Sequence, residues 1–251
     1  MKSSFAQLES ALGQRQQQGR PLHFFLRDDD VDEAEAALKT LLTLCWRYEI
    51  PINLAVIPGR LTDAAISLLD KWMQRNPKLI ELSQHGSRHL NHERKGKKSE
   101  FGASRSFDEQ LADIAAGQSK MNEAFGQNWF PAFVPPWNRC TTATATALDQ
   151  LGFRVLSRDA GQPLFQNCRF TELPVSVDIF RWKGGAAFRS PEELAAELTK
   201  QINSQARIGM MLHHKVMDDA AFAWLDEFLR LLNRFSIVRR HTFQSLVTPN
   251  P

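Results

Sequence analysis

The sequence of 251 residues contains only three cysteines, Cys45, Cys140 and Cys168, and none of them belongs to a CxxC pair. Thiols that are odd in number and widely separated predict neither a disulfide framework nor a cysteine zinc site. We interpret all three as reduced, buried thiols.

Long apolar runs are also absent. No stretch approaches the roughly 20 consecutive apolar residues that a membrane span needs, and the first 19 residues lack the apolar core of a signal peptide. The sequence therefore predicts a soluble, cytoplasmic protein without a membrane span.

Neither sign of charge is in large excess. The 31 basic and 28 acidic residues give a formal net charge of +3, and the one dense basic run is ERKGKK at 93–98, so nucleic acid is not an expected partner. The hydrophobic content of 43% is sufficient for a core. We expect one domain over 1–251, with 1–20 as an N-terminal helical extension and an oligomeric state that composition leaves open.

After residue 20, short apolar runs alternate with amphipathic helical stretches. The runs that predict strands are LHFFLR, INLAVI, LIELSQ, WFPAFV, FRVLS, ELPVSV, IGMMLH and FSIVR. The pairs with capping-box spacing are Asp32 with Glu35, Ser106 with Glu109 and Ser190 with Glu193. This alternation predicts an α/β fold, namely a distorted or incomplete (β/α) barrel of TIM type with about seven to eight strands, although a doubly wound open sheet alternates in the same way.

Two stretches interrupt this pattern. Residues 86–106 form a long polar segment, and a loop of this length in a compact domain is usually functional or disordered. Residues 157–189 are irregular and contain at most one expected strand.

Polar residues follow three of the expected strands: Asp28 to Asp30, then His85 and His89, then His213 and His214. In α/β folds, ligands bind at the carboxyl ends of the strands, where these residues are expected to lie. Each group has a simpler explanation, an acidic turn before a helix or an ordinary surface or core histidine. Together, however, two imidazoles and one carboxylate form a three-ligand set for a divalent metal, and a spare carboxylate would serve as a general base.

Four segments in this order, FFLRDDDV, ELSQHGSRH, FVPPWNR and MMLHH, extend from residue 24 to residue 214. Their order resembles that of the polysaccharide deacetylase family, also called the NodB-homology or carbohydrate esterase family 4 domain. The resemblance implies a metal-dependent hydrolase that removes an N-acetyl group from a sugar. The implied cofactor is a divalent ion, zinc first, with cobalt, nickel and manganese as alternatives.

Carried over residue by residue, the resemblance gives Asp29 as the catalytic base and Asp30, His85 and His89 as the metal ligands. It also gives the backbone N–H of Trp137 as a donor to the oxyanion.

The chain departs from the family pattern in several places. The arginine of the RPPY segment is missing, and Arg139 or Arg27 could replace it. The LxH segment maps literally to Leu212 for the acetyl pocket and His214 for the acid.

A shift of one residue would make Met211 and His213 the pair instead, so the acid stays open between the two histidines. Asp28 has no assigned role, and Asp159 is a candidate partner of the acid histidine.

We expect the substrate to contact four residues, Pro136, Leu212, Arg139 and Glu100. The 86–106 segment is predicted as an active-site loop, either a lid whose Lys95, Lys97 and Lys98 favour an anionic ligand or a solvated, mobile loop. The predicted substrate is a saccharide precursor, such as a nucleotide-linked or lipid-linked sugar. Two alternatives stay open: hydrolysis of another C–N bond in a small cyclic amide, and a catalytically silent carbohydrate-binding domain.

Overall fold

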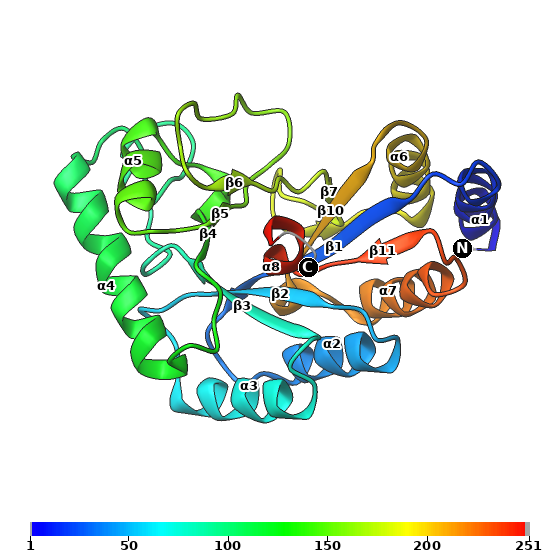
Figure 1. Ribbon diagram of the computed structural model, residues 1–251, viewed down its shortest axis with the longest axis horizontal. Helices are drawn as coiled ribbons and strands as arrows, with labels where there is room; N and C mark the ends of the chain where they lie inside the picture. Colours follow the sequence, from blue (N-terminus) through cyan, green and yellow to red (C-terminus); the bar gives the residue numbers. More distant parts are fainter. Residues whose placement is uncertain (1, 249–251) are drawn as a thin grey trace.

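The computed structural model describes residues 2–248 and has a parallel sheet of nine strands as its central feature. The sheet curls into a distorted (β/α) barrel with helices around its outside (Figure 1). The strands are β1 (Leu22–Val31), β2 (Ile52–Val56), β3 (Ile80–His85), β4 (Ala132–Val134), β5 (Val155–Leu156), β6 (Thr171–Glu172), β7 (Val177–Asp178), β10 (Arg207–Leu212) and β11 (Val238–Arg240). A separate antiparallel hairpin consists of β8 (Phe180–Arg181) and β9 (Ala187–Phe188).

The helices are α1 (Lys2–Gln17), α2 (Ala36–Arg47), α3 (Asp63–Arg75), α4 (Phe107–Phe125), α5 (Thr142–Gln150), α6 (Pro191–Ser204), α7 (Asp219–Leu232) and α8 (Phe243–Val247), with 3-10 turns η1 (Pro136–Asn138) and η2 (His214–Val216). Helices α2 to α7 each connect one strand to the next along the chain, whereas α1 precedes β1 and α8 follows β11. None of the helices in residues 2–248 is both long and apolar enough to cross a membrane.

The strand order distinguishes the barrel from a doubly wound sheet. Neighbours run β6-β5-β4-β3-β2-β1-β10-β7, and β11 pairs with the first residues of β1. The first six strands thus follow the chain around the sheet, whereas a doubly wound sheet reverses direction after its first half. The barrel alternative of the sequence analysis is confirmed.

One extended segment, 171–178, contributes both of the strands at the two ends of this order. Its first part, β6, pairs with β5, and its last part, β7, pairs with β10. Between them, the Val175 N–H donates to the carbonyl of Arg158 (2.9 Å) and the Ser176 N–H to that of Gly209 (2.8 Å). The run ELPVSV therefore contributes two short strands, and the expectation of at most one strand in 157–189 is wrong.

The helices pack through the apolar stripes that their periodicity predicts. In α2, Leu38, Leu41, Leu42 and Cys45 are fully buried, and α7 buries an equivalent stripe. The predicted N-terminal helix is α1, and its Leu8 lies in the same core. Cys140 and Cys168 are only partly buried, so the prediction of buried thiols is correct for Cys45 alone.

Two of the three predicted capping boxes are present, at Ser106 with Glu109 and at Ser190 with Glu193. The third, Asp32 with Glu35, is wrong. Helix α2 begins at Ala36, and no side chain caps it. The carboxylates of Asp32 and Glu35 are engaged instead by residues after β10.

Candidate metal and catalytic site

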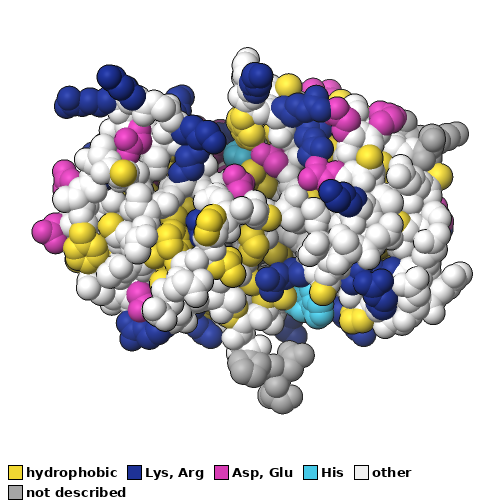
Figure 2. All heavy atoms as spheres, turned by 90° about the horizontal axis from the view of Figure 1, so that it is seen from above, with side chains coloured by type: hydrophobic (Ala, Val, Ile, Leu, Met, Phe, Trp, Pro, Cys, Tyr) yellow, Lys and Arg dark blue, Asp and Glu magenta, His cyan; other side chains and the backbone are white. Residues whose placement is uncertain are grey.

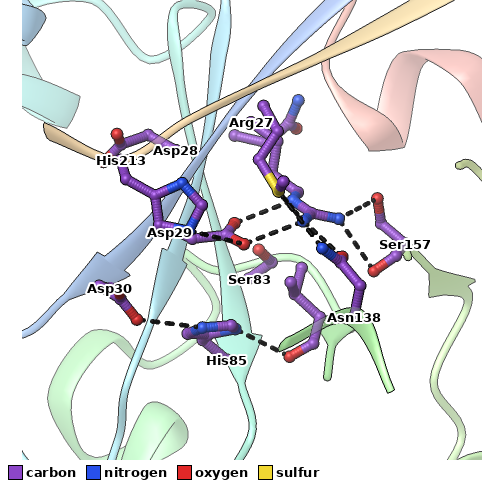
Figure 3. Close-up of polar contacts among 12 residues, drawn as sticks. Arg27, Asp28, Asp29, Asp30, Ser83, His85, Asn138, Ser157 and His213 are labelled. Atoms are coloured by element: carbon purple, nitrogen blue, oxygen red, sulfur yellow. Dashed lines mark hydrogen bonds and ion pairs between the residues drawn. The ribbon is translucent and has the colours of Figure 1, made fainter. Parts of the chain in front are cut away.

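The carboxyl ends of the barrel strands surround a cavity of about 530 Å³. Its lining residues are Asp29, Asp30, His85, His89, Lys98, Trp137, Asn138, Arg139, Asp159, Asp178, Trp182, Gly185, Ala186, Met211 and His213. Figure 3 shows how side chains from β1, β3 and the end of β10 converge there.

A β-bulge explains why three adjacent aspartates have different surroundings. Successive side chains of a strand point to opposite faces, so Arg27 and Asp29 share the inner face of β1 and Asp28 lies on the other. The pairing of β1 with β2 shifts register between Asp28 and Val31, and Asp30 has a left-handed φ of 70°. This irregularity places Asp30 at the cavity beside Asp29.

The two histidines of the HxxxH segment meet the Asp30 carboxylate. His85, the last residue of β3, has its Nδ1 3.0 Å from the carbonyl of Val134, which as acceptor fixes the proton on Nδ1. Its Nε2 lies 3.3 Å from Asp30 Oδ1, and the Nε2 of His89 lies 3.2 Å from the same oxygen. The candidate ligand atoms of all three residues lie within 4.8 Å of one another.

These residues fit a divalent metal ion. Asp30 Oδ1 is buried and, despite its proximity to two imidazoles, makes no well-formed hydrogen bond. Burial alone would raise the pKa of Asp30, but the adjacent His85 and His89 outweigh it and hold the pKa well below its usual range. Burial and the charge of His85 lower the pKa of His89 to about 4, which leaves its ring neutral. An ionised carboxylate with imidazole nitrogens is a donor set typical of zinc.

Backbone strain is concentrated around this cavity. Of the six described non-glycine residues with positive φ, four line it, namely Asp30, His89, Trp137 and Asn138. Such conformations persist only where the surrounding structure enforces them, and they gather at functional sites.

Asp29, the predicted base, is held by Arg27. The guanidinium donates from Nε to Asp29 Oδ1 (2.8 Å) and from Nη2 to Oδ2 (2.9 Å), and the Arg27 side chain is fully buried. Its Nη1 donates to the carbonyl and hydroxyl of Ser157 and its Nη2 to Asn138 Oδ1. Burial alone would raise the pKa of Asp29. The positive charges of Arg27, His85 and His213 outweigh this effect and lower the pKa below its usual value, so the carboxylate is ionised at neutral pH.

Of the two arginines predicted as substitutes for the motif arginine, Arg27 is the one that contacts Asp29. Arg139 lines the cavity but forms no ion pair with Asp29 among the described residues. The spacing of Arg27 and Asp29, two residues apart on a strand, was the available signal for this pairing.

At the end of β10, His213 rather than His214 faces the cavity. Met211 and His213 lie on the inner face, and the Nε2 of His213 is 3.9 Å from Asp29 Oδ2. Leu212 lies in the hydrophobic core under the helices. The literal assignment of Leu212 and His214 to the site is corrected to the shifted pair, because strand alternation turns the literal pair outward.

His214 belongs to a buried ionic network behind the strands. Its Nδ1 lies 2.6 Å from Asp28 Oδ2 and its Nε2 2.7 Å from Glu35 Oε2, and its backbone N–H donates to Asp28 Oδ1 (2.8 Å). Lys215 contacts the carboxylates of Asp32 and Glu35. Asp28, which had no role in the sequence analysis, thus ties β1 to the end of β10.

Two further predicted substrate contacts are also corrected. Glu100 is 1% exposed, and its carboxylate accepts hydrogen bonds from the backbone N–H groups of Ser87, Arg88 and Leu90. It therefore braces the 86–106 loop and does not reach the cavity. Pro136 is buried against Gly86.

Trp137 and Trp182 form aromatic parts of the cavity wall. The Trp137 ring lies 4.4 Å from that of His89, and its N–H belongs to the second residue of η1, a position without an acceptor inside the turn.

Trp182 and Asp178 lie in an irregular segment without periodicity and were not among the predicted site residues. The Trp182 ring lies 4.5 Å from that of His213, and its Nε1 donates to Asp178 Oδ2 (2.7 Å). Asp159 also lines the cavity, but no described contact joins it to His213.

No family model matches the sequence, and no curated protein matches it. Solved structures do match the fold. A protein from Mycobacterium smegmatis, provisionally named a polysaccharide deacetylase, is 15% identical over 91% of this chain and 90% of that chain, with a TM-score of 0.74.

A family 4 acetyl xylan esterase from Clostridium thermocellum, in complex with a cobalt ion, is 15% identical over 89% of each chain, with a TM-score of 0.61. A peptidoglycan deacetylase from Bacillus subtilis is 14% identical over 90% of each chain, with a TM-score of 0.58. The chain has the fold of polysaccharide deacetylases and family 4 carbohydrate esterases.

Proposed function

We propose that the protein is a divergent polysaccharide deacetylase, a metal-dependent hydrolase that removes the acetyl group from an N-acetylated sugar. The observation that carries this proposal is the meeting, in one cavity, of the ligand set Asp30, His85 and His89 with Asp29 and His213. The fold shared with deacetylases and esterases supports hydrolysis.

Asp30, His85 and His89 would hold the divalent ion, with zinc as the first candidate and cobalt, nickel or manganese as alternatives. When bound, such an ion polarises a carbonyl and lowers the pKa of water.

Asp29 is placed to accept the proton of the water that attacks the acetamide carbon, and Arg27 fixes the orientation of its carboxylate. The Trp137 N–H is available to donate to the oxyanion that develops on the acetamide oxygen.

His213 then donates a proton to the nitrogen as the C–N bond breaks, which yields acetate and a free amine. The T-shaped contact with Trp182 restricts its imidazole.

Two alternatives were left open by the sequence. A silent carbohydrate-binding domain was suggested by the missing motif arginine, and the pairing of Arg27 with Asp29 removes that motive. Hydrolysis of a small cyclic amide would use the same groups, so only products distinguish it. A nucleotide-linked or lipid-linked sugar remains the proposed kind of substrate.

The test is a product assay with purified, zinc-loaded protein on N-acetylated sugars and cyclic amides. We expect acetate from the sugars, and a loss of at least about 100-fold in Asp29→Asn, as typical for removal of a general base. Ring-opened products without acetate would favour the amide alternative. Binding without any product, with equal affinity in Asp29→Asn, would contradict the hydrolase.

A further inference from the structure

Two cations, Lys98 and Arg139, line the same cavity as the candidate catalytic residues. Lys98 belongs to the 86–106 loop, and Arg139 is the residue that follows η1. Figure 2 shows basic side chains beside a hollow in which a histidine and acidic side chains are visible.

The backbone around these two cations is held by hydrogen bonds within the chain. Arg139 Nη1 donates to the carbonyl of Lys98 (2.8 Å), and the hydroxyl of Ser99 donates to the carbonyl of Arg139 (3.3 Å). The side chain of Asn91 accepts from the Ser99 N–H (2.9 Å), and Glu100 holds three further N–H groups of the loop. Loop and turn thus support each other, which argues against the solvated, mobile alternative for this part of the loop.

Neither cation is committed to a carboxylate. Within residues 2–248, no ion pair involves Lys98 or Arg139, and the one side-chain hydrogen bond of Arg139 goes to a carbonyl. Arginine has five N–H donors and lysine has three, so most of these donors are available to a ligand in the cavity.

The aspartates of the cavity have other partners. Asp29 is bound by Arg27, and Asp30 lies against two histidines. Asp178 accepts from the indole of Trp182 and from a backbone N–H. Asp159 has no described hydrogen bond, and none of these four aspartates forms an ion pair with Lys98 or Arg139 in the described part of the chain. Neither cation is therefore neutralised by a direct carboxylate contact.

We propose that the substrate is an N-acetylated sugar that carries a phosphate group, and that Lys98 and Arg139 bind this phosphate. The inference rests on the proposed function, because it takes the acetyl group to lie at Asp29 and His213. Arginine forms paired hydrogen bonds to phosphate, and lysine contributes a compact charge. The other lysines of the loop, Lys95 and Lys97, do not line the cavity.

The test is equilibrium binding measured by calorimetry, which needs no turnover. N-acetylglucosamine 1-phosphate and neutral N-acetylglucosamine are the two probes, each added to zinc-loaded wild type, Lys98→Ala, Arg139→Gln and the double variant. Lys97→Ala is the matched control, since it removes the same charge from the same loop away from the cavity. Because Lys98→Ala leaves every described backbone contact in place, it remains informative even if Arg139→Gln unfolds.

We expect the phosphorylated probe to bind wild type and Lys97→Ala at least about tenfold more tightly than the neutral one, as for a charge-assisted contact. The preference should fall in each single variant and disappear in the double variant. Equal affinities in wild type would overturn the inference. So would a preference that survives in the double variant but is lost in His89→Ala, since the phosphate would then bind at the metal.

Acetate release from both probes is measured in parallel. A binding preference without acetate contradicts the hydrolase and leaves the phosphate site standing. Equal release from both sugars with equal affinities leaves the hydrolase standing and contradicts the phosphate site.

Discussion

Arg27 and Asp29 form a two-point ion pair on one face of β1, with N–O distances of 2.8 and 2.9 Å and both side chains buried. Neighbouring inner-face positions of the same strand thus supply the proposed base and the group that orients it. A paired buried carboxylate keeps its charge without solvent, so this pair keeps the proposed base ionised.

Replacement of Arg27 by lysine tests whether orientation matters beyond charge. Lysine keeps the positive charge but loses the planar fork that holds both oxygens. We expect the rate of acetate release in Arg27→Lys to fall about 100-fold, the scale of a misplaced catalytic group. Full activity in this variant would show that Arg27 does not position Asp29.

The two adjacent histidines should respond differently to substitution. His213→Gln is expected to reduce acetate release by about 100-fold or more, as for loss of a general acid, with a small change in melting temperature. His214→Gln breaks a buried charge pair and should lower the free energy of unfolding by about 3–5 kcal/mol. The reverse pattern, a catalytic loss confined to His214→Gln, would restore the literal assignment of the acid.

The network around His214 should make stability depend on alkaline pH. Burial alone would lower the pKa of His214, but Asp28 and Glu35 raise it to about 9, above its ordinary value of 6.5. A raised pKa means that the contribution is complete below about pH 6.5 and is lost as the pH rises through 9. That contribution is on the order of 3 kcal/mol.

Urea denaturation at pH 6 and pH 9.5 measures this contribution as the difference between wild type and His214→Gln. The difference should shrink at the higher pH. His92→Gln, which changes an exposed histidine, is the control. A constant difference across the two pH values would mean that His214 is not charged in the folded protein.

Gly86, next to His85, should tolerate no side chain. Its φ is +60°, and a Cβ there would lie 2.1 Å from Glu100 Oε2 and 2.6 Å from Pro136 Cγ. Gly86→Ala is therefore expected to cost about 2–4 kcal/mol of stability, from overpacking together with left-handed strain, and to weaken metal binding.

Gly96→Ala provides the matched control for this substitution. Gly96 lies in the same loop with a φ of +81°, but nothing lies within 4 Å of its Cβ position. Its cost should be limited to about 1–2 kcal/mol of backbone strain. Equal costs at both glycines would contradict the close packing of Gly86 against Glu100.

The strands and the histidine pair could be predicted from the sequence because they depend on local pattern. Apolar runs gave the barrel strands, and the fixed spacing of His85 and His89 brought two imidazoles to one site. It was harder to predict which residues face the inside of the barrel, since a shift of one residue on β10 exchanges His213 for His214. The contacts of β1 distinguish the two histidines, because Arg27 and Asp29 share the inner face and His213 lies beside Asp29.

Long-range partners could not be derived in this way. The carboxylate of Glu35 has the spacing of a helix cap, yet a buried histidine 179 residues away binds it, because an unpaired buried imidazolium would cost more than a missing cap. Glu100 looked like a cavity residue but satisfies backbone N–H groups of its own loop. The hairpin that brings Trp182 to His213 follows an irregular segment without periodicity.

Metal content tests the central claim most directly. Plasma mass spectrometry of purified protein should find about one zinc or similar divalent ion per chain in wild type and in His92→Ala, a histidine of the same loop outside the ligand set. Asp30→Ala and His89→Ala should retain none. The account would be contradicted if wild type bound no ion after incubation with zinc, cobalt, nickel or manganese, or if both ligand variants kept it.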